Sequence, residues 1–286
     1  MRTLAGRWYG AIVLALTVPR GVWADDKPNV TVHKTATGVR FALLGSKGEA
    51  PAPTLFVFAV GAPDTLRNND FNKVGRLLAQ QGFLCVSLDV PCHGEDQKPK
   101  EPVGLDGWRA RLEKGDALVS EFVKNSSAVL DHLIKEGYTD ARRVAACGTS
   151  RGGFIALHFA AAEPRVRCVA ALAQVTNLLV LREFAGLEKH KATRALDLTN
   201  SADKLAGRHV WVCIGNRDDR VSTDDVIAFT RKVARATPTS DRPAPVDLHI
   251  MPTLGHRIHA TAHEEAAAWV LACMKDAGKR RPGAGR

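Results

Sequence analysis

The sequence predicts an α/β protein with a mostly parallel central sheet and helices on both of its faces. Short apolar runs of strand length alternate with longer segments whose apolar residues recur at helical spacing. Two of the runs, residues 54–60 and 83–89, are almost continuously apolar, which is typical of strands buried on both faces. This alternation favours parallel strands joined by helices that pack outside the sheet.

The elements of the N-terminal half follow from this alternation and from the glycines and prolines that interrupt it. A helix is expected over residues 68–81 because Phe71, Val74 and Leu78 share one stripe, and Gly82 ends it. The expected order is strands over 29–33, 39–44 and 54–60, a break at 61–63, the helix over 68–81, a strand over 83–89, a loop over 90–107, and a long amphipathic helix over 108–136 with Gly115 as a candidate break.

The C-terminal half continues the same pattern. Residues 144–147 form a short apolar strand, and a helix begins after Ser150. The expected order is then a strand over 166–172, a mostly helical insertion over 176–207 after this sixth strand, a strand over 209–214, a helix over 223–236, a strand over 246–251 and a last helix over 260–275. Ligands of such sheets bind beyond the carboxyl ends of the strands. The loops at that edge therefore hold the candidate site.

Residues 148–153 read Gly-Thr-Ser-Arg-Gly-Gly and join a strand to a helix. In this context Gly-x-Ser-x-Gly indicates a nucleophile elbow, a sharp turn that holds the hydroxyl of Ser150 out of the sheet. Gly148 and Gly152 leave room for the close backbone approach that such a turn requires. The alternative is a glycine-rich turn whose serine only caps the helix. Partners further along the chain favour the catalytic interpretation.

Two later strands are also followed by loops with catalytic side-chain types. Residues 215–221 carry Asp218 and Asp219, and residues 252–256 end in His256. Serine, aspartate and histidine then occur in the order known for triads on this kind of sheet. A serine hydroxyl needs a base to remove its proton, and an aspartate orients that base and stabilises its charged form. We therefore expect Ser150 as nucleophile and His256 as base.

His256, His259 and His263 could instead share a helical face and bind zinc. The base is favoured because His256 falls in a loop directly after Gly255, and no metal is expected. His93, in a Pro-Cys-His-Gly segment, is expected to shape the rim of the substrate pocket.

Four motifs together resemble the α/β-hydrolases of the prolyl-oligopeptidase and dienelactone-hydrolase branch. They are GTSRGG at the elbow, IGNRDDRVST in the acid loop, LGH in the histidine loop and SLDVPCHGED after the strand over 83–89. The resemblance covers residue 54 to the final helix and implies the α/β-hydrolase fold. Matching the acid loop to the pattern G-x-x-D-x-R-V implies Asp218 as the catalytic acid, with the adjacent Asp219 as the alternative. Either aspartate could also be a turn former or a helix cap.

The oxyanion hole of such an enzyme uses backbone N–H groups. One is expected from Arg151, the residue after the nucleophile. The resemblance implies Ala62 for the second, with Gly61 allowing close approach. Here the sequence departs from the family pattern, because Val60-Gly61-Ala62 occupies the positions of the common H-G-[GFY] motif. No histidine side chain then supports this loop.

Four further side chains are candidates for substrate contacts. Arg151 and Arg182 could pair with a substrate carboxylate, since a guanidinium binds one bidentately. Trp108 and Phe184 could line the acyl pocket. The alternatives are arginines that face solvent or pair internally, and aromatic residues that belong to the core.

The two ends are expected to lie outside a hydrolase domain of residues 25–277. A basic start, an apolar run over residues 11–18 and small residues before Asp25 predict a signal peptide over residues 1–24. The run is too short to predict a stable membrane anchor after cleavage. Residues 278–286 are expected to form a disordered basic tail. The ends carry +3 and +4 of the net charge of +10, so the body shows no charge pattern that favours nucleic acid as a partner.

The sequence thus predicts an exported serine hydrolase that cleaves carboxylic esters of small or medium substrates. One alternative is a peptidase or acylaminoacyl-type amidase, and another is a non-catalytic binding protein on the same scaffold. An ester is favoured because too few residues precede residue 54 for the propeller that restricts access to prolyl oligopeptidases. The motifs imply no cofactor. They leave open the choice between a small ester and a short peptide, and the oligomeric state.

Overall fold

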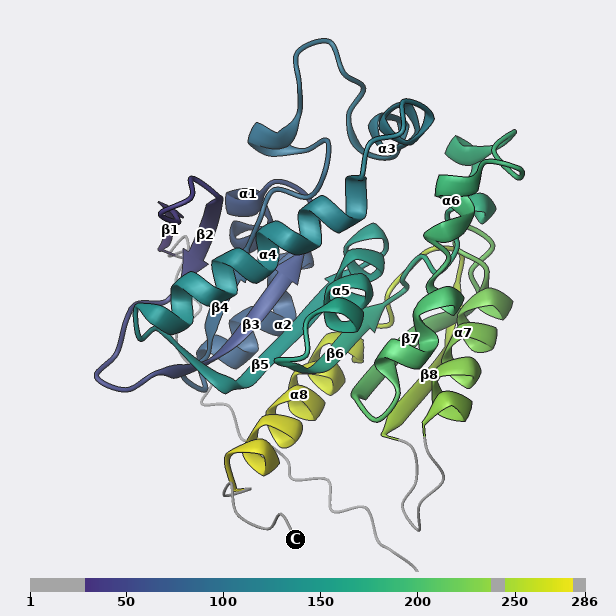
Figure 1. The fold of residues 1–286 in the computed structure, drawn as a ribbon. Helices are drawn as coiled ribbons and strands as arrows, with labels where there is room; N and C mark the ends of the chain where they lie inside the picture. The colour runs from purple at the N-terminus through teal and green to yellow at the C-terminus, as the bar shows by residue number, and fades with distance from the viewer. Residues whose placement is uncertain (1–28, 238–244, 280–286) are drawn as a thin grey trace, which may run out of the picture.

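The computed structural model of the chain describes residues 29–237 and 245–279, so the predicted signal peptide, residues 1–24, lies outside the described residues. Within the described part, one sheet has the order β1-β2-β4-β3-β5-β6-β7-β8 (Figure 1). β1, β2 and β4 pair antiparallel, and the remaining neighbours pair parallel, which confirms the predicted mostly parallel sheet. The strands are β1 (Val30–Lys34), β2 (Arg40–Leu44), β3 (Ala52–Phe58), β4 (Leu84–Ser87), β5 (Thr139–Thr149), β6 (Val166–Leu172), β7 (His209–Arg217) and β8 (Val246–Leu254).

Helices cover both faces of the sheet, as predicted (Figure 1). One face carries α1 (Ala62–Arg67), α2 (Asn69–Ala79) and α8 (Ala262–Lys279), and the other carries α4 (Leu118–Lys135), α5 (Arg151–Ala162) and α7 (Thr223–Ala236). Each face has its own core. Leu55 and Val57 of β3 belong to the first core, and Phe56 and Phe58 belong to the second. Because successive side chains of a strand point to opposite faces of the sheet, β3 contributes side chains to both cores.

Most element boundaries agree with the expected ones, and the differences have local causes. The sequence predicts a break at Gly61 and Pro63, where the structure has α1, because a proline fits the first turn of a helix, where its missing N–H is not needed. The helix expected over 108–136 is two helices, α3 (Gly104–Glu113) and α4, separated at Gly115, whose φ is +81°.

Several C-terminal elements run past their predicted ends. β5 spans Thr139–Thr149 instead of 144–147, and β7 continues to Arg217 instead of ending at 214. β8 continues to Leu254 instead of ending at 251, and α8 continues to Lys279 instead of ending at 275. The tail predicted from residue 278 therefore begins inside this helix, and its remainder, residues 280–286, lies outside the described residues.

The insertion between β6 and β7 is built from short helical turns. They are η2 (Leu178–Val180), η3 (Arg182–Phe184), α6 (Lys191–Ala195) and η4 (Leu198–Leu205). Leu178, Phe184 and Leu198 are fully buried, so the insertion packs into the core on the α5 side. In Figure 1 it lies beside α3, at the edge of the sheet where the parallel strands end.

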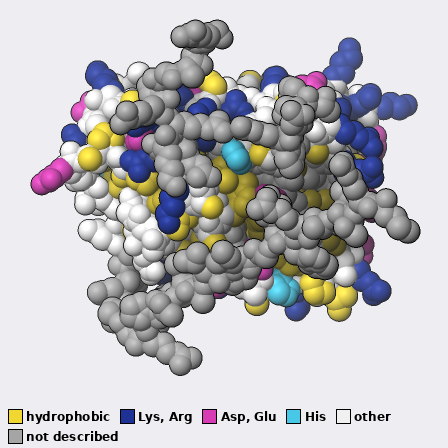
Figure 2. Space-filling model, turned by 90° about the horizontal axis from the view of Figure 1, so that it is seen from below, with side chains coloured by type: hydrophobic (Ala, Val, Ile, Leu, Met, Phe, Trp, Pro, Cys, Tyr) yellow, Lys and Arg dark blue, Asp and Glu magenta, His cyan; other side chains and the backbone are white. Residues whose placement is uncertain are grey.

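Figure 2 views the molecule from the side opposite these loops. Lys and Arg side chains lie around the periphery of this face, with apolar side chains between them. None of the helices in the described ranges is long and apolar enough to cross a lipid bilayer.

Candidate active site

Ser150 occupies the sharp turn between β5 and α5. Its φ of +55° and ψ of −120° lie in a region that side-chain-bearing residues seldom adopt, and such strain gathers at functional sites. The flanking glycines are needed for steric reasons. A Cβ on Gly152 would overlap the carbonyl oxygen of Phe58, and one on Gly148 would overlap the main chain of Gly152. The elbow predicted from the sequence is the observed geometry.

Ser150, His256 and Asp218 form one continuous chain of hydrogen bonds. His256 Nε2 lies 2.9 Å from Ser150 Oγ, and His256 Nδ1 lies 2.8 Å from Asp218 Oδ2. A carboxylate can only accept, so Nδ1–H donates to Asp218 and Nε2 is left to accept the serine proton. This is the tautomer that a general base requires. The structure thus brings together the three residues that the sequence selected.

The two adjacent aspartates of the acid loop have different environments. Asp218 is 1% exposed, and its Oδ1 accepts the N–H groups of Arg220 and Val221 at 3.0 and 3.2 Å. Asp219 is exposed. The main-chain donors hold one oxygen of Asp218 and leave the other to orient His256. The structure therefore places Asp218, and not Asp219, within hydrogen-bond distance of His256.

Arg220 ties the acid loop to the insertion, a link that the sequence reasoning missed. Its Nη1 and Nη2 donate to the two carboxylate oxygens of Glu183 in η3, at 2.8 and 2.7 Å. Paired bonds of this kind fix orientation as well as position. The arginine was visible in the G-x-x-D-x-R-V pattern, but no local signal identified Glu183 as its partner. The insertion thereby helps to position Asp218.

The second predicted oxyanion donor is wrong. The N–H of Ala62, the first residue of α1, donates to Asp89 Oδ1 at 2.6 Å and is therefore not free for an oxyanion. Asp89 also accepts from Arg40 Nη1 at 2.7 Å, so it is held in place as a cap for the start of α1. The first predicted donor, the N–H of Arg151, lies at the N-terminus of α5, directly after Ser150. Helix-start N–H groups have no partner within the helix.

The side chain of Arg151 crosses from α5 to the end of β3. Its Nε donates to the carbonyl oxygen of Ala59 at 3.1 Å. Burial, and then the charge of Arg220, lowers the pKa of this guanidinium below its ordinary value. His93 lies on the same side, 7% exposed, with Nδ1 2.9 Å from the carbonyl oxygen of Pro91. Burial and the charge of Arg151 lower the pKa of His93, so its ring is neutral at pH 7.

The other candidate substrate contacts lie in the core or at the surface. Trp108 and Phe184 are fully buried, and Trp108 Nε1 donates to the carbonyl oxygen of Pro91 at 2.7 Å, so both belong to the core. The side chain of Arg182 is 88% exposed. His259 Nδ1 contacts Thr261 Oγ1 at 2.9 Å. Within the described residues, no three His, Cys, Asp or Glu side chains are grouped so that they could hold a metal ion.

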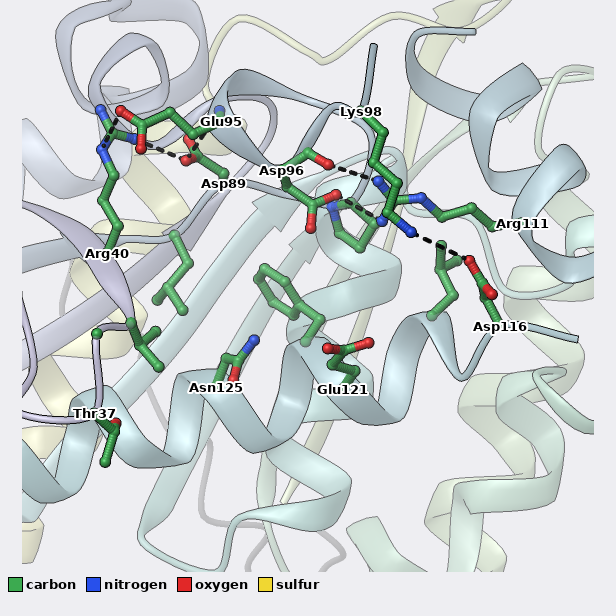
Figure 3. Close-up of a pocket in the computed structure, with 16 residues that line it drawn as sticks. Thr37, Arg40, Asp89, Glu95, Asp96, Lys98, Arg111, Asp116, Glu121 and Asn125 are labelled. Atoms are coloured by element: carbon green, nitrogen blue, oxygen red, sulfur yellow. Dashed lines mark hydrogen bonds and ion pairs between the residues drawn. The ribbon is translucent and has the colours of Figure 1, made fainter. Parts of the chain in front are cut away.

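A charged cavity of about 420 Å³ lies between the loop after β4 and α4, and none of the triad residues lines it. Figure 3 shows ion pairs across it, and each arginine or lysine faces an acidic side chain. The pairs join Arg40 to Asp89 and Glu95, Arg111 to Asp96, and Lys98 to Asp116. Five carboxylates and three cationic side chains line this cavity, so each cation is paired within it, and it is separate from the candidate active site.

A family model described as the prolyl oligopeptidase family matches residues 107–277, which include all three triad residues. The esterase FrsA of Serratia proteamaculans (strain 568) is 31% identical over 168 residues, which are 58% of this chain and 35% of the relative. Acylamino-acid-releasing enzyme 2 of Oryza sativa subsp. japonica is 29% identical over 139 residues, which are 47% of this chain and 16% of the relative. The chain thus spans only a minor part of the length of either relative.

Solved structures share the fold at low sequence identity. Acetyl xylan esterase 1 from Thermoanaerobacterium has a TM-score of 0.62 and 18% identity, and the match covers 86% of this chain and 88% of that one. A structure described as a putative dipeptidyl aminopeptidase IV from Bacteroides ovatus has a TM-score of 0.66 and 17% identity, and the match covers 87% of this chain and 35% of that one. These likenesses show an α/β-hydrolase fold.

Proposed function

Because the chain belongs to the prolyl oligopeptidase family of serine hydrolases, we propose that it cleaves carboxylic esters of small or medium size through an acyl-enzyme on Ser150. The observation that carries this proposal is the hydrogen-bond chain from Ser150 Oγ through His256 to Asp218. It joins three loops that are far apart in the chain, and each member has the partner that its chemical role needs.

The reaction follows from this geometry. His256 Nε2 takes the proton of Ser150 Oγ as the oxygen attacks the ester carbonyl carbon, and the N–H of Arg151 donates to the developing oxyanion. His256 then returns the proton to the leaving alcohol, and an acyl-enzyme remains on Ser150. Water attacks that acyl group in the second half, again with His256 as base. Asp218 stabilises the imidazolium in both halves and holds the ring in place.

An ester substrate is supported by two of the comparisons. One curated relative is named an esterase, and the acetyl xylan esterase structure is matched over most of both chains. An ester also makes the smaller demand on the site, because an alkoxide leaves more easily than an amide nitrogen. The second candidate is an amidase, which the acylamino-acid-releasing relative and the peptidase-like structure favour.

A covalent probe and a matched substrate pair test the proposal. A fluorophosphonate should label the wild-type chain and fail to label Ser150→Ala. The wild type should hydrolyse p-nitrophenyl butyrate, and Ser150→Ala should lose about 10⁴-fold in kcat. The corresponding butyryl p-nitroanilide has the same acyl group and should be cleaved at least tenfold more slowly. Comparable rates on the two substrates would favour the amidase, and a folded wild type that takes no label would favour the non-catalytic binding protein.

Export belongs to the same proposal and is supported by the composition of residues 1–24 alone. N-terminal sequencing of the protein recovered from cells that express the full chain tests it. A mature start at Asp25 is expected, and a retained Met1 in the soluble fraction would refute cleavage.

A further inference from the structure

A half-buried arginine lies directly beside the nucleophile without an acidic partner. The guanidinium of Arg151 makes one hydrogen bond, from Nε to the carbonyl oxygen of Ala59, and within the described residues no carboxylate lies within ion-pair distance of it. A guanidinium has five N–H donors, so four remain for another acceptor. Because Arg151 follows Ser150 in the chain, these donors lie at the same edge of the sheet as the serine hydroxyl.

Most of the other shielded arginines have an acidic partner. A charge taken out of water is costly unless it is paired and hydrogen-bonded. Among these arginines, Arg40 pairs with Asp89 and Glu95, Arg111 with Asp96 and Glu101, Arg165 with Glu163, and Arg220 with Glu183. Arg208 instead donates to three main-chain carbonyl groups, and Arg76 donates to the main-chain carbonyl group of Arg67.

The surroundings of Arg151 supply no free carboxylate to replace the missing partner. Its Nη1 end lies near Gly104, where a Cβ would be 3.9 Å from Nη1 and 3.6 Å from His93 Nε2. The His93 ring is neutral and offers a lone pair at Nε2, since Nδ1 donates to a main-chain carbonyl. The charge of Glu183 reaches Arg151, but both of its oxygens are held by Arg220. The positive charge therefore remains available to a ligand.

We propose that Arg151 binds a carboxylate in the acyl part of the substrate, so that the preferred substrates are monoesters of dicarboxylic acids. This inference rests on the proposed function and names the substrate class of the same site. A planar guanidinium with free Nη donors matches a carboxylate with two parallel hydrogen bonds. The acyl chain then extends from the carbonyl carbon at Ser150 to the carboxylate at Arg151.

The experiment compares esters that differ only in charge. Monoethyl succinate, glutarate and adipate are each measured beside the ethyl ester in which a carboxamide replaces the carboxylate. The wild type should show a kcat/KM at least tenfold higher for the anionic member at one chain length or more. Arg151→Met should lower that ratio to about one, mainly through KM, and Arg151→Lys should retain part of it because a charge without the planar fork remains.

Arg182→Met is the matched control, since it removes an exposed arginine from the neighbouring insertion. The ratio should stay within twofold of wild type in this variant. Equal kcat/KM for the two members of every pair in the wild type would overturn the inference and leave the hydrolase proposal intact. Equal losses on both members in Arg151→Met would also overturn it, because they would show a structural role alone.

If the wild type takes the fluorophosphonate label but cleaves no ester of any pair, the inference is tested by protection of Ser150 from labelling. Adipate, and not adipamide, should slow the labelling of Ser150, and equal protection by both would overturn the inference. If the folded wild type takes no label, the proposed function itself fails, and this inference fails with it.

Discussion

Two polar assemblies lie at the carboxyl end of the sheet, and they are built in opposite ways. Around Arg111, every charge meets an opposite one, since its guanidinium contacts Glu101 at 2.7 Å and Asp96 at 2.7 Å. In the triad only Asp218 is fully enclosed by partners, and the chain of hydrogen bonds ends at Ser150 Oγ. A closed network holds a loop in place, whereas an open one leaves an atom ready to react.

The largest expected effect separates the two aspartates of the acid loop. Asp218→Asn should lower kcat by roughly 10³ to 10⁴-fold, because an amide at this position favours the wrong tautomer of His256. Asp219→Asn is the matched control and should stay within about threefold of wild type, since that side chain is exposed. Steady-state kinetics on p-nitrophenyl butyrate measure both variants. The reverse order of losses would remove Asp218 from the triad.

Breaking the closed network should instead cost stability. Arg111→Met leaves Glu101 and Asp96 without their cation, and we expect the free energy of unfolding to fall by about 3 kcal/mol. Urea denaturation measures the change, and kcat at low temperature should stay within about threefold of wild type because the triad is untouched.

Arg142→Met provides the control for that stability measurement. The Arg142 side chain is 60% exposed and pairs with Asp140 at 3.4 Å, so its loss should cost less than about 0.5 kcal/mol. Equal destabilisation by the two variants would show that burial of the Arg111 network contributes nothing beyond a surface ion pair.

The last expected effect is on the pH dependence of stability and concerns the histidine of the elbow helix. His158, on α5, has Nε2 3.1 Å from the carbonyl oxygen of Leu196, and burial lowers its pKa to about 4. The unfolded chain, with an ordinary histidine pKa near 6.5, then binds more protons than the folded chain between these values. Stability is therefore present at neutral pH and is lost as the pH falls from about 6.5 towards 4, by an amount on the order of 2 kcal/mol.

His158→Gln tests this assignment because glutamine keeps a donor near the position of Nε2 but does not titrate. The variant should lose less stability than wild type between pH 7 and pH 4.5 in urea denaturation at both pH values. An unchanged difference between the two pH values would mean that other groups carry the acid sensitivity. His256 makes the contrast, since its Nδ1 lies 2.8 Å from a carboxylate oxygen of Asp218, whereas His158 contacts a main-chain carbonyl group.

Much of this protein can be predicted from local patterns. The buried strands, the strand–turn–helix at Ser150 and the order of serine, aspartate and histidine all appear in short stretches of sequence, because side-chain period and turn chemistry are local properties. The parallel sheet follows from the alternation of elements. The missed helix α1 and the extended ends of β8 and α8 show that boundaries are less well determined than the elements themselves.

Only the tertiary structure decided the contacts between residues that are distant in the chain. The N–H of Ala62 looks available in the sequence, and it is Asp89, 27 positions later, that takes it. Arg220 gains Glu183 as a partner across 37 positions, and this leaves Arg151 without one. A hydrogen bond depends on distance and direction in space, so the sequence names the groups that can pair, and the packing of the sheet edge selects the pairs.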